Sequence, residues 1–146
     1  MSFAHLHVHT EYSLLDGSNK IKEYVKKAAD LGMTAAAITD HGVRYGVIDF
    51  YREAKAAGIN PVLGCELYVA PESRFDREPG GSSGDDRYYH LILLAENNEG
   101  YANLTKIVSI GFVDGFYYKP RVDFETLEKY HEGLICLSAC LAGEVP

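Results

Sequence analysis

The sequence of 146 residues contains no tryptophan, no long apolar run and only three cysteines. Cys65, Cys136 and Cys140 form no CxxC pair, so their spacing excludes a disulfide framework and a zinc finger and is typical of a reducing compartment. No apolar run reaches the length of a membrane span, and the N-terminus lacks the charged and then apolar pattern of a signal peptide. These absences predict a cytoplasmic location and no membrane partner.

Positive charge is also scarce, since 14 lysines and arginines face 21 aspartates and glutamates and the net charge is −7. Such a balance argues against unaided binding to a polyanion, although a site that holds several divalent cations would change the charge locally. The 47% of hydrophobic and 24% of charged residues are ordinary for a globular protein. The length predicts about one domain with a sizeable core.

Strand and helix patterns alternate along the chain, without an internal repeat or a domain linker. This alternation predicts an α/β fold of mostly parallel strands with helices outside, as an open sheet or a barrel. Residues 71–87 have the composition of a mobile surface loop, and residues 111–122 are aromatic and irregular. Strands are predicted at 4–9, 35–40, 61–69, 89–95 and 133–137; helices are predicted at 20–31 up to Gly32, from Val47 up to Gly58, at 100–110 and at 124–130.

Two short strings carry the clearest chemical signal, HLHVHT at 5–10 and ITDH at 38–41. Histidines that alternate with Leu6 and Val8 would lie on one face of a strand. In the second string a run of small and apolar residues ends abruptly in polar ones, as when a buried strand delivers polar groups to a site. Imidazoles and carboxylates together are typical of a metal site with nitrogen and oxygen ligands. The strings therefore predict a metal-dependent hydrolase.

Further candidate ligands fall at the predicted strand ends, where α/β proteins bind their ligands. Asp16 follows the first strand in the turn LLDG, in which glycine permits a tight bend. No helix separates the third strand from the fourth, so we expect an antiparallel pair that brings His90 beside Glu66. The candidates predicted at one rim are His7, His9, Asp16, His41, Glu66, His90 and Cys140.

Each candidate also has a structural explanation. A strand histidine can fill a core, Asp16 can simply form a turn, and Cys140 can pack as a small hydrophobe. Glu66 can end an exposed strand. Several other residues are expected to be structural: His5 in the core or an interface, Cys65 and Cys136 in the core, His131 as a solvated helix cap, and Asp40 as a partner that orients an imidazole.

Longer blocks carry a family resemblance. HLHVHTEYSLLDG, ITDHGVRYGVIDFYREAKAAGINPVLGCELYVAP, YYHLILLAEN, GFYYKPRVDFETL and GLICLSACLAGEVP closely resemble the N-terminal PHP (polymerase and histidinol phosphatase) domain of bacterial DNA polymerase III α subunits. The resemblance implies a distorted, TIM-like (βα)7 barrel, here truncated after about five strands, with a cluster of divalent ions at its mouth. It assigns the ions, zinc or manganese with iron or magnesium as alternatives, to His7, His9, Asp16, His41, Glu66, His90 and Cys140.

One family motif, an Asp-x-His pair on a later strand, is absent from residues 1–146. We therefore expect this chain to be the N-terminal part of the domain. Weak or no catalysis by the chain alone is expected, since the metal cluster would lack ligands. An open sheet edge would also lead to self-association or leave the chain only marginally stable.

The resemblance implies a function in DNA replication, as part of a DNA-directed DNA polymerase that binds a DNA primer-template and other replisome subunits. We expect metal-dependent phosphodiester hydrolysis, as a 3′→5′ proofreading exonuclease, with His7, His9, His41 and Glu66 as catalytic residues. Lys119 and Arg121 are candidate contacts to the DNA backbone, or else parts of a structural loop. The alternatives are a non-catalytic scaffold that stabilises the polymerase and a phosphomonoesterase similar to histidinol phosphatase.

Overall fold

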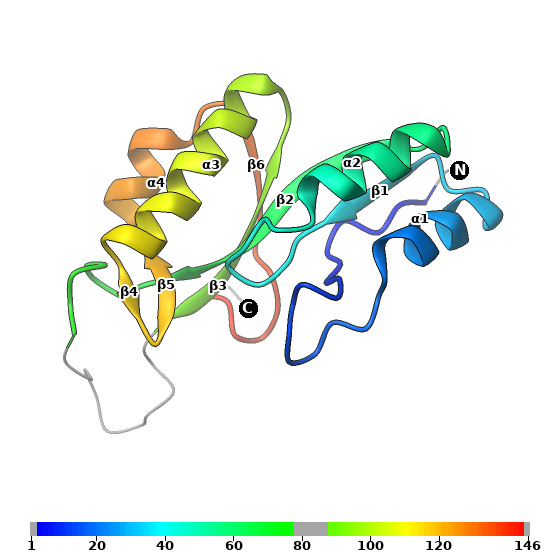
Figure 1. The fold of residues 1–146 in the computed structure, drawn as a ribbon. Coiled ribbons are helices and arrows are strands. Elements are labelled where there is room, and N and C mark those ends of the chain that lie inside the picture. Colours follow the sequence, from blue (N-terminus) through cyan, green and yellow to red (C-terminus); the bar gives the residue numbers. More distant parts are fainter. Residues whose placement is uncertain (1–2, 78–87, 145–146) are drawn as a thin grey trace. The chain divides into compact units, whose positions relative to one another are not determined.

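The structure is a computed structural model that describes residues 3–77 and 88–144, and the chain divides into two units, residues 1–65 and 66–146. Figure 1 shows the elements in chain order. They are α1 (Ile21–Asp30), β1 (Ala35–Ile38), α2 (Val47–Ala56), β2 (Asn60–Val69), β3 (Tyr89–Ala95), α3 (Asn98–Val113), β4 (Phe116–Tyr117), β5 (Lys119–Val122), α4 (Phe124–Tyr130) and β6 (Leu134–Leu137).

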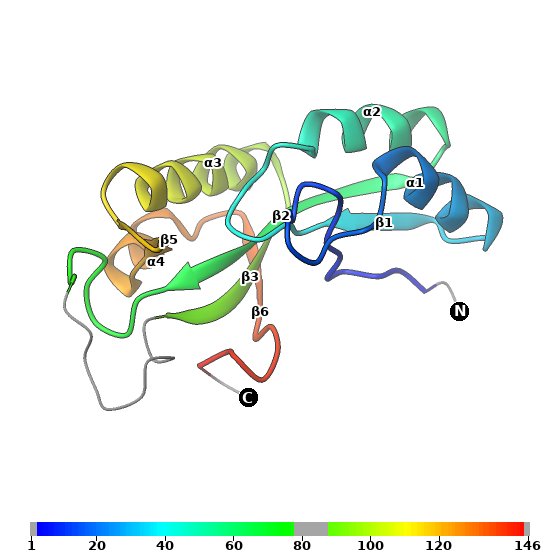
Figure 2. The same cartoon turned by 60° about the horizontal axis from the view of Figure 1, so that its bottom comes forward.

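In the first unit, β1 pairs in parallel with the first half of β2, in a register that joins Ala37 to Val62. Helices α1 and α2 pack against each other, and both contact β1 (Figure 2). Val25 of α1 and Phe50 of α2 are at most 2% exposed, as apolar residues at helical spacing should be. This packing fixes β1, whose carboxyl end carries the ITDH string.

Both helices of this unit end at the glycines that the sequence indicated. Gly32 and Gly58 adopt φ values of 74° and 72°, a left-handed conformation that favours glycine. The N–H group of Ile59, just after Gly58, donates to the carbonyl of Ala54 at 2.9 Å and thereby satisfies a carbonyl of the last turn of α2.

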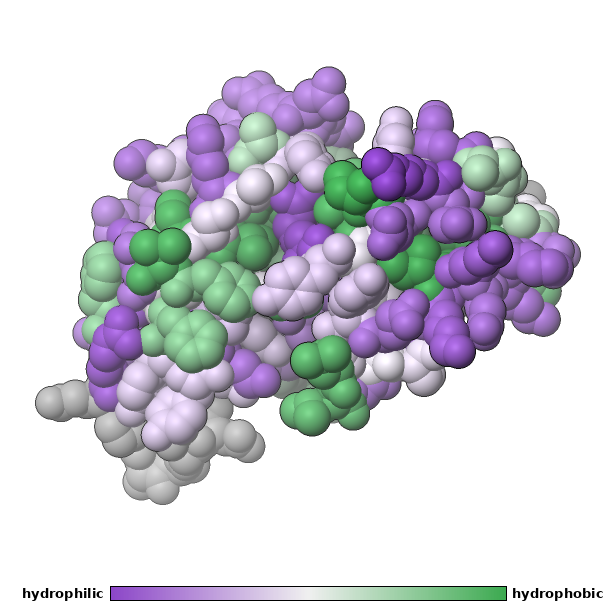
Figure 3. Space-filling view, viewed as in Figure 1, coloured by the Kyte–Doolittle hydropathy of each residue, from purple (hydrophilic) through white to green (hydrophobic). Residues whose placement is uncertain are grey.

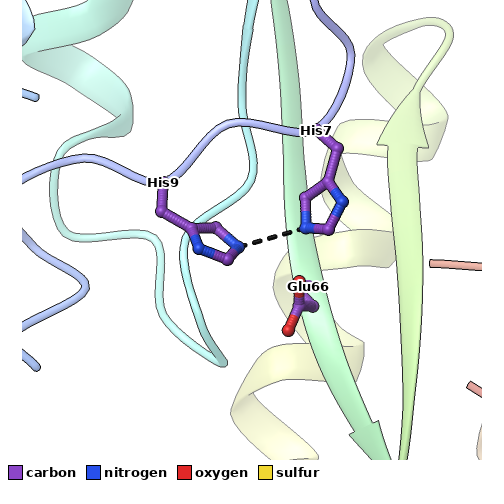
Figure 4. Close-up of side chains that lie close together, drawn as sticks. All are labelled: His7, His9 and Glu66. Carbon is purple, nitrogen blue, oxygen red and sulfur yellow. Dashed lines mark hydrogen bonds between the residues drawn. The ribbon is translucent and has the colours of Figure 1, made fainter. Parts of the chain in front are cut away.

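In the second unit, the strands follow the order β4-β5-β2-β3-β6, and this path of described strands is not closed. Helix α3 packs against β3, β5 and β6, and α4 packs against α3. Strands β2 and β5 are parallel, whereas β4 is antiparallel to β5 and β3 is antiparallel to β6. Figure 4 shows the arrows of β2 and β3 in opposite directions. The antiparallel direction of β3 confirms the expectation drawn from the missing helix before it, whereas β4, which joins β5 through one residue and runs antiparallel to it, departs from the predicted parallel arrangement.

Two further predictions need correction. Residues 4–9 form no regular strand; the chain bends at Leu6 and His7. The segment 111–122 is not irregular, since it holds the end of α3 and the hairpin of β4 and β5. Residues 71–77 contain no helix or strand, and the rest of the predicted loop lies outside the described residues.

The surface of the second unit carries apolar side chains. Figure 3 shows hydrophobic groups over the C-terminal part of α3, where Phe112, Val113 and Phe116 are 38%, 81% and 47% exposed. Within the described ranges, no helix has the length and apolar composition needed to cross a membrane.

Candidate metal centre

The carboxyl end of β1 delivers polar side chains as its sequence predicted. Ile38 is the last residue of the strand, and Thr39 and Asp40 remain 0% and 1% exposed. His41 follows with a partly exposed side chain. A buried strand thus ends in two buried polar anchors and one accessible imidazole.

The HLHVHT string lies beside that strand end without becoming a strand itself. The Thr39 N–H donates to the Val8 carbonyl at 2.9 Å, but the Val8 N–H donates to the Thr39 hydroxyl oxygen at 2.7 Å instead of a backbone carbonyl. The Thr39 hydroxyl therefore accepts a hydrogen bond that a backbone carbonyl would accept in the expected strand ladder. The neighbouring histidines still converge, because Nε2 of His7 and Nε2 of His9 lie 3.1 Å apart (Figure 4).

Asp16 joins two imidazoles of the same unit. Its Oδ2 atom lies 2.9 Å from Nε2 of His41 and 3.8 Å from Nδ1 of His9. The rings of His9 and His41 also lie close, with centroids 3.8 Å apart. One ligand atom from each of these residues lies within 4.8 Å of the others. Two nitrogens and one carboxylate oxygen therefore share one small volume.

These separations fit a divalent metal ion. Metal–nitrogen and metal–oxygen distances of about 2.0–2.2 Å in a tetrahedral site place neighbouring ligand atoms about 3.3 Å apart. The two measured distances from Asp16 Oδ2 to the imidazole nitrogens, 2.9 and 3.8 Å, lie on either side of that value. Neutral imidazole and carboxylate ligands suit zinc and manganese. The donor set of the first unit is thus compatible with the predicted ions.

The turn before Asp16 is tight because Gly17 has no side chain. A Cβ atom at Gly17 would lie 1.8 Å from the carbonyl oxygen of Thr10. The Gly17 N–H donates to the Ser13 carbonyl at 2.8 Å and closes the turn. The sequence assigned this role to the glycine of LLDG, and the structure confirms it.

Asp40 organises the same turn. Its carboxylate accepts hydrogen bonds from the Thr10 N–H, the Thr10 hydroxyl and the Ser13 hydroxyl, at 2.6, 2.7 and 2.8 Å. The Ser13 hydroxyl in turn accepts from the His41 N–H at 3.2 Å. Asp40 was predicted to orient an imidazole, but its described bonds order the backbone that carries the ligands. Sequence reasoning assigned no role to Thr10 or Ser13, although Thr10 is the last residue of the HLHVHT string.

The second unit contains another group of candidate ligands. Glu66, the residue of β2 labelled in Figure 4, is 1% exposed, and its Oε1 atom lies 2.9 Å from Nδ1 of His90 on β3. The Sγ atom of Cys140 lies 3.7 Å from the same ring nitrogen. The hypothesis that the reversed β3 brings His90 beside Glu66 is confirmed. Carboxylate, imidazole and thiol are again a donor set that zinc accepts.

A cleft of about 400 Å³ lies in the first unit between α1, the HLHVHT string and the turn that carries Asp16. Its lining includes His7, His9 and Asp16 from the candidate centre and Lys27 from α1. Tyr24 lines the α1 side and donates its hydroxyl to the Ala37 carbonyl at 3.1 Å. Burial raises the pKa of Tyr24 despite this backbone hydrogen bond, so the phenol stays protonated. Three candidate ligands of the first unit therefore line this cleft.

Four further residues were predicted from the sequence to have structural roles, and the structure confirms only some of these predictions. Cys65 is fully buried, and His131 is the exposed C-cap of α4, both as predicted. The prediction of a core residue was wrong for Cys136, which is exposed, and the exposed His5 does not fill the core, the first of the two roles expected for it. His5 lies in the part of the string that forms no strand, and Cys136 lies on a strand at the end of the described sheet path.

Lys119 and Arg121 also differ from each other. Arg121 is 3% exposed and donates to the carbonyls of Gly115, Arg74 and Asp76. Its described contacts are those of a structural residue, which leaves Lys119 as the candidate phosphate contact. Lys119 is partly exposed, and its Nζ lies 5.3 Å from the centroid of the Tyr68 ring.

The chain has a mixed α/β fold with histidine, carboxylate and thiol side chains at strand ends. These features are those of a protein with a candidate metal centre. The family model of the PHP domain matches residues 5–146. The chain therefore belongs to the PHP domain family.

Curated relatives and one solved structure are similar to this chain. The chain is 54% identical to DNA polymerase III subunit alpha of Treponema pallidum over 146 residues, and 51% identical to that of Aquifex aeolicus over 144 residues. These matches cover 100% and 97% of this chain but only 12% of each relative, so the chain spans about an eighth of their length. A crystal structure from Bifidobacterium adolescentis, described as a candidate metal-dependent phosphoesterase, has a TM-score of 0.52 and 20% identity over 73% of this chain and 32% of its own. That likeness shows a shared fold.

Proposed function

We propose that this chain forms part of a bacterial DNA polymerase III α subunit and binds divalent metal ions for phosphodiester hydrolysis. The observation that carries the proposal is the convergence of His9, Asp16 and His41, whose ligand atoms lie within 4.8 Å of one another. The identity of 54% to a polymerase subunit supports the assignment to replication. The proposed reaction is removal of a nucleotide from the 3′ end of DNA, as in proofreading.

We assign the metal ligands to both units. The first unit would supply His7, His9, Asp16 and His41, and the second would supply Glu66, His90 and Cys140. Bound divalent ions lower the pKa of a water ligand and stabilise charge on phosphate oxygens. Within the chain, the Asp16 carboxylate lies close to His9 and His41, and the Glu66 carboxylate lies close to His90, so each set of donor atoms is already gathered. Cys140 would bind as thiolate, which favours zinc at its position.

Metal content provides the first test. The purified chain is equilibrated with zinc or manganese, freed of excess ion and analysed for metal. We expect at least one bound ion, lost or strongly reduced in His9→Ala and Asp16→Ala, while the exposed His131→Ala retains it as the matched control. A wild-type chain without bound metal would favour the scaffold alternative.

The activity test needs the context of a whole subunit, which supplies any ligands from outside this sequence. The matching segment of the Treponema pallidum subunit is replaced by this chain, and removal of a mismatched 3′ nucleotide is measured with zinc or manganese. We expect His9→Ala to abolish that removal, while DNA synthesis by the same protein reports correct folding. Unchanged removal in His9→Ala would overturn the proposal. Hydrolysis of a phosphomonoester without action on DNA would favour the phosphatase alternative.

We also propose that the chain associates with itself and, in the whole subunit, contacts a DNA primer-template and other replisome subunits. The described sheet path ends at β4 and β6, and Ile135 of β6 is 47% exposed. Light scattering should therefore report a mass above 16.2 kDa. A stable monomer would contradict self-association and leave the metal proposal intact.

A further inference from the structure

The turn between β4 and β5 holds an exposed tyrosine in an unusual backbone conformation. Tyr117 pairs with Lys119 across the hairpin, and Tyr118 alone forms its tip. Tyr118 has a φ of 60°, a left-handed value that bulky residues rarely adopt and that costs about 1–3 kcal/mol. Its ring is 65% exposed, although it contacts the Tyr117 ring edge-on at 4.7 Å. Burial in the core therefore does not explain a tyrosine at this position.

The next residue places a positive charge close to the candidate ligands of the second unit. The Lys119 Nζ atom lies 5.3 Å from the Tyr68 ring centroid, and the Tyr68 ring lies 5.4 Å from the His90 ring. His90 in turn contacts Glu66. One aromatic ring thus separates the ammonium group from a proposed metal ligand.

Three arginines of this unit are already engaged. Arg74 forms an ion pair with Asp123, Arg77 donates to the carbonyls of Phe116 and Asp114, and Arg121 is buried. Across residues 3–77 and 88–144, no carboxylate forms an ion pair with Lys119. In a chain with a net charge of −7, this ammonium group is placed to attract an anion.

We propose that Tyr118 and Lys119 form a nucleotide-binding element, in which the Tyr118 ring stacks on a base and the Lys119 ammonium pairs with a phosphate. Stacking on an exposed ring requires an unstacked base, so the ligand is a single-stranded DNA end and not a duplex or a small phosphate ester. This inference rests on the proposed function only for the choice of nucleic acid as ligand. It extends that function by naming the part of the substrate that the second unit recognises.

The test measures binding without metal, by fluorescence anisotropy at low salt. The probes are a labelled oligo(dT) and an oligonucleotide of the same length with abasic sites, which retains the phosphates and lacks the bases. Tyr118→Asn removes the ring and suits a left-handed backbone, while Tyr118→Phe keeps the ring. Tyr51→Asn, at an exposed tyrosine of α2, is the control for the loss of a ring.

We expect Tyr118→Asn to weaken oligo(dT) binding about fivefold or more and to leave the abasic probe unaffected. Tyr118→Phe and Tyr51→Asn should bind both probes as the wild type does. Failure of the wild type to bind oligo(dT), or equal binding by Tyr118→Asn, would overturn the role of the ring.

Lys119→Ala should weaken binding of both probes and reduce the slope of log K against log salt by about 0.7, the value for one phosphate contact on a single strand. Its control is Lys106→Ala, because the Lys106 Nζ also lies 5.3 Å from a tyrosine ring, that of Tyr130. Equal effects of the two lysine variants would overturn the phosphate contact.

The two proposals fail in different ways. Metal content should be unchanged in Tyr118→Asn and Lys119→Ala, and thermal unfolding confirms that each variant folds. If DNA binding fails while metal binding persists, only the nucleotide-binding element is wrong. If metal binding fails while the base-dependent DNA binding persists, only the proposed hydrolysis is wrong.

Discussion

Asp40 holds Thr10 at two points, since Oδ1 accepts from the Thr10 N–H at 2.6 Å and Oδ2 accepts from the Thr10 hydroxyl at 2.7 Å. The two residues lie 30 positions apart in the chain, and both are at most 1% exposed. This contact joins the end of β1 to the end of the HLHVHT string. It also precedes the turn that carries Asp16, so the ligand geometry of the first unit depends on it.

Loss of the Asp40 carboxylate should therefore be costly. Asp40→Ala leaves three buried donors of Thr10 and Ser13 without this acceptor, and each such group costs about 1–3 kcal/mol. We expect the free energy of unfolding to fall by about 3 kcal/mol or more. Urea unfolding measures this loss, with Thr10→Val as a comparison that should cost about 1 kcal/mol. Equal losses in the two variants would show that the contacts of Asp40 other than the Thr10 hydroxyl contribute little to stability.

Gly17 should control metal affinity, because the backbone of Thr10 approaches it too closely to leave room for a side chain. In Gly17→Ala the new methyl group would overlap the Thr10 carbonyl oxygen, so the turn must move and carry Asp16 with it. We expect zinc affinity to fall about tenfold or more. Gly58→Ala is the matched control, because its Cβ would meet open space and only the left-handed φ adds a cost of about 1–2 kcal/mol. Competition with a chelating dye gives both affinities, and an unchanged affinity in Gly17→Ala would contradict this role.

The helices and the strands β1, β2, β3 and β6 could be predicted because local patterns determine them. Apolar spacing marked α1, and Gly32 and Gly58 provided chain reversals that need no partner elsewhere. The contact of Glu66 with His90 also followed from a local fact, the absence of a helix between β2 and β3. The order and direction of the strands alone therefore predict that Glu66 and His90 lie side by side.

The remaining features depend on contacts that the sequence does not display. The HLHVHT string alternates like a strand, yet the Thr39 hydroxyl takes the place of a ladder carbonyl and the chain bends. The hairpin of β4 and β5 has a single residue at its tip, so it lacks the usual Asn-Gly signal. In the sequence, Arg121 of YYKPR is a candidate DNA contact. In the folded chain, it donates to three backbone carbonyls that the sequence alone does not place near it.

Arg121 should behave as a structural residue. Arg121→Met keeps an apolar stem but leaves the carbonyls of Gly115, Arg74 and Asp76 without their donor. We expect the free energy of unfolding to fall by about 2–4 kcal/mol, against less than about 0.5 kcal/mol for the partly exposed Lys119→Ala. Chemical denaturation tests the difference. If Arg121→Met is fully stable and instead reduces the salt dependence of DNA binding, Arg121 is a phosphate contact after all.

Acid should weaken the second unit through Asp123. This carboxylate is 2% exposed, caps α4 through the Thr126 N–H, and pairs with the Arg74 guanidinium at 2.9 Å. Burial raises the pKa of Asp123, but hydrogen bonds from Arg74 and Thr126 outweigh it and leave the pKa below its usual value. A lowered pKa stabilises the folded chain above the unfolded pKa of about 3.9, and this contribution is lost as pH falls through the lower, folded value.

Asp123→Asn isolates this effect, because asparagine also caps helices but carries no charge. We expect the variant to be about 2 kcal/mol less stable between pH 5 and pH 7, since hydrogen bonds to charged groups contribute about 1.5–3 kcal/mol. The difference should shrink below about pH 4 as the wild-type carboxylate becomes protonated. Urea unfolding across this range gives the profile, with Glu125→Gln as control because Glu125 is 82% exposed and 3.6 Å from the same guanidinium. A difference that stays constant into strong acid would mean that the Asp123 charge does not stabilise the fold, and that its cap alone does.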